Sequence, residues 1–238
     1  MLPGQFTING LKSVDINAVI TEWFDIPRPA RKLTLNTTPV KLDRALIYDD
    51  AAYENRTFTM SVGIKGNASV NRDKLLNVLD SGSYLDANFY LDNEYVYQIV
   101  SADVIETTRP MKTVDYLALS IKVSAAPFKY DINNDSVSVT DTATLTNPHP
   151  YASKPIITLT GTGDISLTVN KSVYNFKGIE SGIIIDSSIQ DAYWTKSGDI
   201  YNLNKTMSHS QFPLLNSGKN TISVSGATAS IEPRWRTL

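Results

Sequence analysis

Few side chains in this 238-residue sequence are placed where they could carry out catalysis. The two histidines, His149 and His209, are far apart in the chain. Neither has a second histidine at metal-ligand spacing, so we expect both in exposed loops. The sequence contains no cysteine, which excludes disulfides, thiolate metal sites and cysteine nucleophiles. Residues 178–182 (GIESG) have the wrong order for a nucleophile elbow, and no phosphate-binding glycine–lysine loop occurs.

Two further stretches have only part of a ligand-binding pattern. Residues 161–164 (GTGD) begin like a dinucleotide-binding loop, but the third glycine is missing and a strand follows, so we predict a hairpin turn there. Asp49 and Asp50, with Glu54 beyond them, lack the spacing of a calcium loop, and we interpret them as a solvated acidic turn. We therefore expect no enzymatic activity, no metal site and no cofactor.

One group of aromatic residues is compatible with carbohydrate binding. Tyr193, Trp194 and Tyr201 lie in a polar stretch, and flat rings on a β-sandwich stack against the C–H faces of sugars. The alternative, which we favour, is that these rings cover one end of a core, as aromatic side chains usually do. We expect the same packing role for Trp23, Phe24 and Trp235. A carbohydrate-binding surface module is therefore kept as the alternative function.

The composition is that of a globular protein. Hydrophobic residues make up 42% of the chain and charged residues 19%, which is enough apolar material for a sizeable core. The net charge of −2 argues against duplex nucleic acid and anionic membranes as partners. No window approaches the apolar length of a membrane span, and MLPGQFTING lacks the regions of a secretory signal. We expect a chain kept in the cytosol or in a particle assembled there.

Most of the sequence alternates apolar and polar residues, as half-buried strands do. Residues 117–123 and 58–64 show this alternation clearly, and each predicts a strand. Residues 88–100 (NFYLDNEYVYQIV) predict a hairpin that turns at Asp92 and Asn93. The pattern therefore favours a mainly β fold.

A single short helix interrupts this pattern. Asn71 is the predicted N-cap, and Leu75, Val78 and Leu79 form an apolar stripe at helical spacing. Val70 and Leu75 have the spacing of a hydrophobic staple across the helix start. We predict about two helical turns on an otherwise β-rich domain.

Residues 30–55 differ from their surroundings because they are rich in charge and sparse in apolar side chains. We interpret them as a long, largely exposed excursion in the form of an extended hairpin. Such projections are uncommon in small domains unless they contact something. We assign a subunit contact to six residues of this excursion: Leu33, Leu35, Leu42, Leu46, Ile47 and Tyr48. The alternative is a surface loop without a partner.

The chain divides into two predicted domains near residue 127. Residues 124–136 (SAAPFKYDINNDS) interrupt the alternation with small residues, a proline and asparagines, as domain linkers do. After them, short alternating runs resume with turn residues between them, which is typical of a β-sandwich. We predict two β-sandwich domains: 1–127, with one short α-helix and a protruding hairpin, and 128–238.

The C-terminal sequence, 212–238 (FPLLNSGKNTISVSGATASIEPRWRTL), resembles the end of the distal tail proteins of siphophages. It has a proline that leads to a glycine–lysine–asparagine turn, a strand, Gly226, another strand and a basic, aromatic tail. Shorter stretches at 6–10, 116–128, 147–163 and 182–187 are similar to the same family. The resemblance therefore covers essentially the whole chain.

This resemblance implies a structural role in a phage tail tip. In that family the first domains form a hexameric ring, with the protruding hairpin as a belt around the neighbouring subunit, and the second domain is a galectin-like β-sandwich. The ring joins the tail tube to the tail-associated baseplate protein and often holds receptor-binding proteins. By this resemblance we expect a homo-hexamer in the virion, assembled in host cytoplasm, with phage DNA passing through the ring.

Two departures from the family limit what the resemblance implies. The chain is too short to hold the inserted carbohydrate-binding module of some relatives. It also shows no segment plainly long enough for the arm that grips receptor-binding proteins in others.

Overall fold

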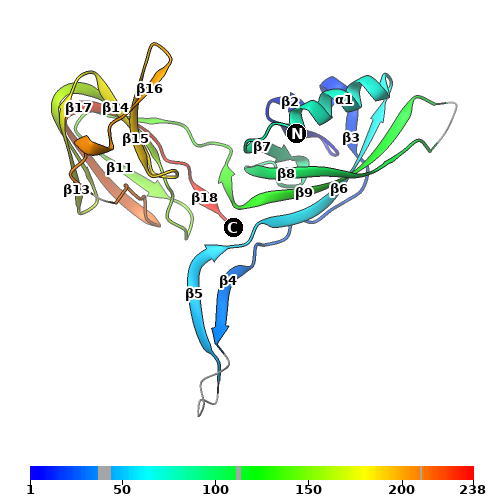
Figure 1. Cartoon of the computed structure of the whole chain (residues 1–238), viewed down its shortest axis with the longest axis horizontal. Helices are drawn as coiled ribbons and strands as arrows, with labels where there is room; N and C mark the ends of the chain where they lie inside the picture. Colours follow the sequence, from blue (N-terminus) through cyan, green and yellow to red (C-terminus); the bar gives the residue numbers. More distant parts are fainter. Residues whose placement is uncertain (37–43, 111–113, 210) are drawn as a thin grey trace. The chain divides into compact units, whose positions relative to one another are not determined.

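Strands make up most of the chain in the computed structural model, which describes residues 1–36, 44–110, 114–209 and 211–238. Contacts divide the chain into two units, Met1–Lys129 with Leu238, and Tyr130–Thr237 (Figure 1). The mainly β architecture expected from the alternation is confirmed. That 1–127 and 128–238 fold as independent domains stays a prediction. In the described part of the chain, no helix is long and apolar enough to cross a bilayer.

The first unit is built on one sheet with the strand order β2-β1-β7-β8-β9-β6-β3. Its strands are β1 (Phe6–Ile8), β2 (Leu11–Lys12), β3 (Ala18–Ile20), β6 (Arg56–Lys65), β7 (Leu85–Phe89), β8 (Tyr95–Thr108) and β9 (Tyr116–Asp131). Two short 3₁₀ turns, η1 (Ser13–Ile16) and η2 (Tyr90–Asp92), connect them.

The alternating segments form the centre of this sheet, as predicted. β6 and β9 pair antiparallel from Arg56 opposite Ala125 to Lys65 opposite Tyr116. The inward side chains of both strands are buried: Phe58, Met60, Val62, Ile64, Leu117, Leu119, Ile121 and Val123. The hairpin predicted at 88–100 is also confirmed, because β7 and β8 pair antiparallel and η2 lies between them.

The helix α1 (Ala68–Leu79) begins a turn earlier than predicted. Its N-cap is Asn67, whose own side chain makes no capping bond. Instead, the carboxylate of Asp115 accepts the first helical amide at 3.2 and 3.3 Å. Asn71 lies inside the helix, and Val70 is 58% exposed, so the predicted cap and staple are both wrong. A cap supplied by a residue far along the chain, just before β9, leaves no local sequence signal.

The excursion forms a separate two-stranded ribbon, as expected. β4 (Arg31–Asn36) and β5 (Leu46–Tyr53) pair with each other in a sheet of their own. Figure 1 shows this ribbon, hereafter the arm, projecting from the first unit.

The second unit has a sheet in the order β10-β17-β12-β14-β15-β16, with β11 also paired to β17 and β13 to β12. Its elements are β10 (Val137–Val139), β11 (Thr142–Asn147), β12 (Ile156–Val169), β13 (Ser172–Ile179), β14 (Gly182–Asp186), β15 (Asp191–Lys196), β16 (Asp199–Asn202), η3 (Asn204–Thr206), β17 (Gly218–Glu232) and β18 (Arg236–Thr237).

The hairpin turn predicted at 161–164 is wrong, because β12 continues through these residues. The strand has a bulge there instead, where its register shifts against both β13 and β17. A Cβ on Gly161 would lie 2.6 Å from the carbonyl oxygen of Gly226, so the two long strands approach closely at this bend. Ile157 and Leu167, on opposite sides of the bend, are buried in one core. The glycines therefore let two continuous strands serve both layers of a sandwich.

Candidate functional site

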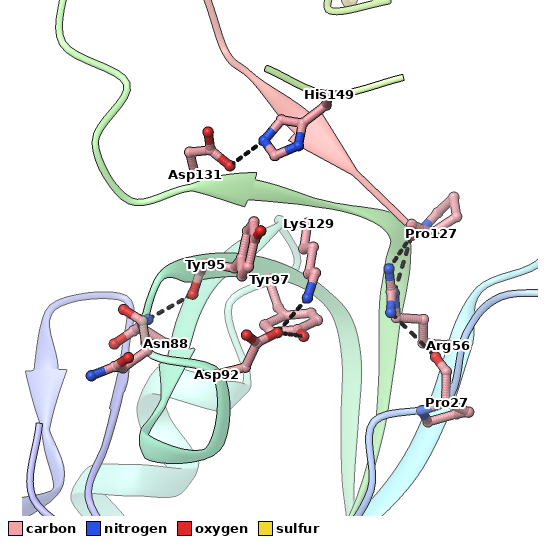
Figure 2. A network of polar contacts seen from close by, with 11 residues as sticks. Pro27, Arg56, Asn88, Asp92, Tyr95, Tyr97, Pro127, Lys129, Asp131 and His149 are labelled. Atoms are coloured by element: carbon pink, nitrogen blue, oxygen red, sulfur yellow. Dashed lines mark hydrogen bonds and ion pairs between the residues drawn. The ribbon is translucent and has the colours of Figure 1, made fainter. Parts of the chain in front are cut away.

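Both histidines lie in loops, as expected, but each is partly rather than fully exposed because it makes a structural contact. The Nε2 atom of His149 lies 2.6 Å from Oδ1 of Asp131 (Figure 2). The ring of His209 packs against Tyr174 with centroids 4.9 Å apart. Across the residues that the structure describes, no group of three or more His, Cys, Asp or Glu side chains could hold a metal ion.

The apolar side chains of the arm are exposed to solvent. No described residue of β4 or β5 is buried. Five of the six residues assigned to a subunit contact have large exposed fractions: Leu33 47%, Leu35 59%, Leu46 41%, Ile47 65% and Tyr48 53%. The sixth, Leu42, lies outside the described residues.

These five side chains occupy both faces of the arm. Leu35 is opposite Ile47 in the register, so these two and Leu33 project to one face. Leu46 and Tyr48 alternate with Ile47 and project to the other face. An isolated two-stranded ribbon is only marginally stable in water. The arm is therefore suited to a partner that covers both of its faces.

The root of the arm is held in place by Arg31. Its Nε donates to Oδ1 of Asp49 at 2.9 Å, and its Nη2 pairs with the other carboxylate oxygen. The hydrogen bond from Arg31 lowers the pKa of Asp49 from its ordinary value, so the pair is charged at neutral pH. The same guanidinium lies over the ring of Tyr53, which packs edge-on against Phe128. The root is thus well supported, while the outer apolar residues are not.

Arg56 ties both ends of the arm to the first unit (Figure 2). Its side chain is buried and donates from Nε and Nη2 to the carbonyl oxygen of Pro127 at 3.0 and 2.8 Å. Its Nη1 donates to the carbonyl oxygen of Pro27 at 3.2 Å. Pro27 precedes β4, and Arg56 is the first residue of β6, the strand that follows β5. One side chain therefore fixes the entry and the exit of the arm against β9.

A second group of polar contacts supports Arg56. Tyr97 donates its hydroxyl, and Lys129 its ammonium, to the same oxygen of Asp92, each at 2.5 Å (Figure 2). The guanidinium of Arg56 lies 5.5 Å from the centroid of the Tyr97 ring. The pKa of Tyr97 is raised above its ordinary value, mainly by burial and next by the hydrogen bond to Asp92. These groups satisfy one another, which points to a structural rather than a catalytic role.

Sequence analysis did not single out Arg56, although a signal for it was present. Arg56 is in phase with Phe58 and Met60, so the alternation places it on the buried face of β6. A charged residue on a buried face is rare unless it is paired, and it marks a position where the fold needs several hydrogen bonds.

The aromatic residues considered for sugar binding lie on the hairpin of β15 and β16. Trp194 and Tyr201 are directly opposite in the register and share a face, whereas Tyr193 projects to the other face. Trp194 is half-buried and Tyr201 is 50% exposed. Both line a pocket of about 290 Å³, and Tyr193 does not. The structure therefore brings together two of the three residues.

Gly182, to which the sequence assigned no packing role, places the indole of Trp194. A Cβ on Gly182 would lie 2.7 Å from both Cη2 and Cζ3 of Trp194, so the ring packs directly on the backbone of β14. The other lining residues combine apolar and polar groups: Gly178, Ile179, Glu180, Ser181, Lys196 and Leu203. The link between Gly182 and Trp194 depends on strand pairing, and no local pattern carries it.

The other two tryptophans differ from each other. Trp235 is partly buried and packs on the core of the second unit, as expected. Trp23 is 72% exposed, so its expected packing role is wrong. Its indole touches Tyr90 edge-on with centroids 6.3 Å apart. Phe24 beside it packs in the core, as expected.

Comparison with known proteins identifies the fold but not a sequence family. No family model matches the chain, and no curated protein matches it significantly. The Dit protein of phage SPP1, described as a paradigm of the hub adsorption apparatus in phages that infect Gram-positive bacteria, matches with a TM-score of 0.66 and 9% identity. The match covers 95% of this chain and 96% of that one. This chain has the fold of the SPP1 Dit protein.

A baseplate structure of phage P2 in its activated conformation with calcium is also similar. It matches with a TM-score of 0.50 and 9% identity over 95% of this chain and 97% of that one. At the level of fold, the resemblance to distal tail proteins inferred from short motifs is confirmed. The Dit-like fold extends through both units, since the match spans nearly the whole chain.

Proposed function

We propose that this protein is a structural component of a phage tail tip, where six copies form a ring-shaped hub. The observation that carries the proposal is the end-to-end likeness to the SPP1 Dit protein. The arm supports it independently, because it is well anchored at its root and presents apolar side chains on both faces. The role is non-enzymatic, as the hub and baseplate proteins among the structural neighbours suggest.

In the proposed ring, the arm of each subunit lies on its neighbour. A contact that recurs from one subunit to the next closes into a ring when the rotation fits. Each closed contact removes exposed apolar area and unpaired strand edges from water. Leu33, Leu35, Leu46, Ile47 and Tyr48 are the side chains that we assign to this contact, with Leu42 as in the sequence prediction.

The proposed hub joins the phage tail tube protein to the tail-associated baseplate protein, with receptor-binding proteins as further partners. This places the protein in the virion, at the tail tip, after assembly in the host cytoplasm. Phage DNA would pass through the ring without sequence-specific contacts. The support for these partners is the kinship of fold with hub and baseplate structures.

The test is native mass spectrometry of the purified chain, with negative-stain images of the same sample. Six copies of the 26.3 kDa chain give a species of about 158 kDa, which should appear as a ring with a central hole. Ile47→Asp should weaken this assembly. Ile189→Asp is the matched control, because Ile189 is as exposed (64%) but lies in the second unit. A chain that is monomeric up to about 100 μM would contradict self-assembly through the arm.

A further inference from the structure

We propose that the pocket lined by Trp194 and Tyr201 is a binding site for one pyranose ring of a neutral saccharide. This inference goes beyond the hub proposal and does not depend on it, since it uses the second unit alone. It rests on the shape, the aromatic walls and the charge balance of the pocket.

The walls of the pocket present ring faces supported from behind. Gly182 lets the indole of Trp194 lie on the β14 backbone, which holds the ring in one orientation. Tyr201 stands next to it across the β15–β16 pair and is half-exposed. Ile179 is buried beneath the pocket, and Leu203 packs against the core of the unit. An apolar face held this rigidly can receive the C–H face of a sugar with little loss of side-chain entropy.

The rim of the pocket is polar and balanced in charge. Glu180, Ser181 and Lys196 line it, and all three are exposed. One carboxylate, one ammonium and one hydroxyl offer hydrogen bonds to a polyol, with no net charge that would select an anion or a cation. The volume of about 290 Å³ is at the lower end for small-ligand sites, which suits one ring rather than a long chain.

The register also explains why the pocket differs from the outer face of the same hairpin. Tyr193 is an aromatic residue one position from Trp194, yet it projects to the opposite face and lines no part of the pocket. An adjacent pair of aromatics, one inside and one outside, provides an internal control for any ligand that binds by stacking.

The experiment is saturation-transfer-difference NMR on the full chain with four probes: maltotriose, cellotriose, triacetylchitotriose and rhamnose. At least one should give transfer to the C–H protons of one ring face. In Trp194→Ala and Tyr201→Ser the transfer should fall about tenfold or vanish. Tyr193→Ala should retain it, and Trp194→Phe should retain part of it. Tyr201→Ser keeps the test valid if Trp194→Ala fails to fold, because Tyr201 is half-exposed.

Three outcomes would overturn the proposal. The first is no transfer to any of the four probes at about 20 mM, a concentration that detects even very weak binding. The second is transfer that survives both Trp194→Phe and Tyr201→Ser unchanged. The third is binding of free indole at this pocket without any sugar, which would mark it as an apolar docking surface for protein side chains. None of these three outcomes bears on whether the chain forms a ring in native mass spectrometry. A failure of the sugar-site proposal can therefore be told apart from a failure of the hub proposal.

Discussion

The arm and the β15–β16 hairpin are both exposed antiparallel pairs, yet their side chains are organised in opposite ways. The arm carries aliphatic residues on both faces and has no buried residue in its described strands. The β15–β16 hairpin places Ala192 in the core and Trp194 on a glycine of the next strand. The first arrangement needs a second surface to bury its side chains, whereas the second is already supported and leaves only a small hollow. This difference is the reason that we propose a protein contact for the arm and a small ligand for the β15–β16 hairpin.

The two hairpins also differ in where their rigidity comes from. Among the described residues, the contacts that hold the arm lie at its root, between Arg31 and Asp49 and between Arg56 and two backbone carbonyls. The β15–β16 hairpin is joined to β14 through Ile184, Ile185 and Asp186 and so belongs to a larger sheet. Substitutions of the exposed contact residues and of the anchoring residues can therefore be made separately, and each tests one of the two hairpins.

The largest expected effect is on assembly. Replacing Leu35 and Ile47 together by aspartate places two charges on one face of the arm, where the proposed contact would have to desolvate them. We expect the ring to dissociate at concentrations at least about 100-fold higher than for the unaltered chain. The thermal midpoint of the monomer should change little, because both side chains are exposed. Native mass spectrometry over a dilution series measures this, and an unchanged ring would remove the arm from the interface.

Arg56→Ala should have the next largest effect, now on stability. It leaves the carbonyls of Pro27 and Pro127 without their buried donor, which should cost about 3 kcal/mol of the unfolding free energy. Urea unfolding measures the loss. Arg72→Ala is the matched control, because within the described part of the chain Arg72 pairs only with its exposed neighbour Asp73. We expect it to lower the unfolding free energy by less than about 0.5 kcal/mol. Equal effects for both variants would show that the arm root does not depend on Arg56.

Gly182→Ala should act on the other hairpin. The added Cβ would meet the ring of Trp194 at 2.7 Å and the carbonyl oxygen of Leu159 at 2.6 Å, so the indole or the strand must shift. We expect the unfolding free energy to fall by about 2 kcal/mol and the fluorescence emission of Trp194 to shift. The control is Ser181→Ala at the neighbouring exposed position, which should change neither the unfolding free energy nor the emission. A Gly182→Ala protein with unaltered emission would mean that the indole does not rest on β14.

The smallest expected effect is that of pH on the arm root. The pKa of Asp49 is lowered in the folded chain, so its contribution is fully present above the unfolded value of 3.8 and is lost as pH falls through the lower folded value. The protection of the β4 and β5 amides from exchange, relative to the unfolded chain at the same pH, should therefore fall below about pH 3.8. Asp49→Asn should show the faster exchange already at neutral pH, and Asp50→Asn should not. Identical profiles for the two variants would exclude a role for the Arg31–Asp49 pair.

The sequence alone predicted the elements whose pattern is local. The alternation at 58–64 and 117–123 gave the central strands, because one buried face of a sheet imposes a period of two on the residues. The scarcity of apolar residues at 30–55 predicted the exposed hairpin, because a segment with few apolar side chains has no face to bury in a core. The helix was found, but its start was not, because Asp115 supplies the cap from another part of the chain.

The long-range contacts were decided only by the tertiary structure. The glycines at 161–163 look like a turn in the sequence and become a bulge, because β17 and β13 continue the pairing on either side. Tyr193 and Trp194 are equivalent in the sequence, and the register of β15 with β16 alone decides which one faces the pocket. Hydrogen bonds and ring contacts depend on which strands become neighbours, and that choice is made by burying one common core rather than by any short segment.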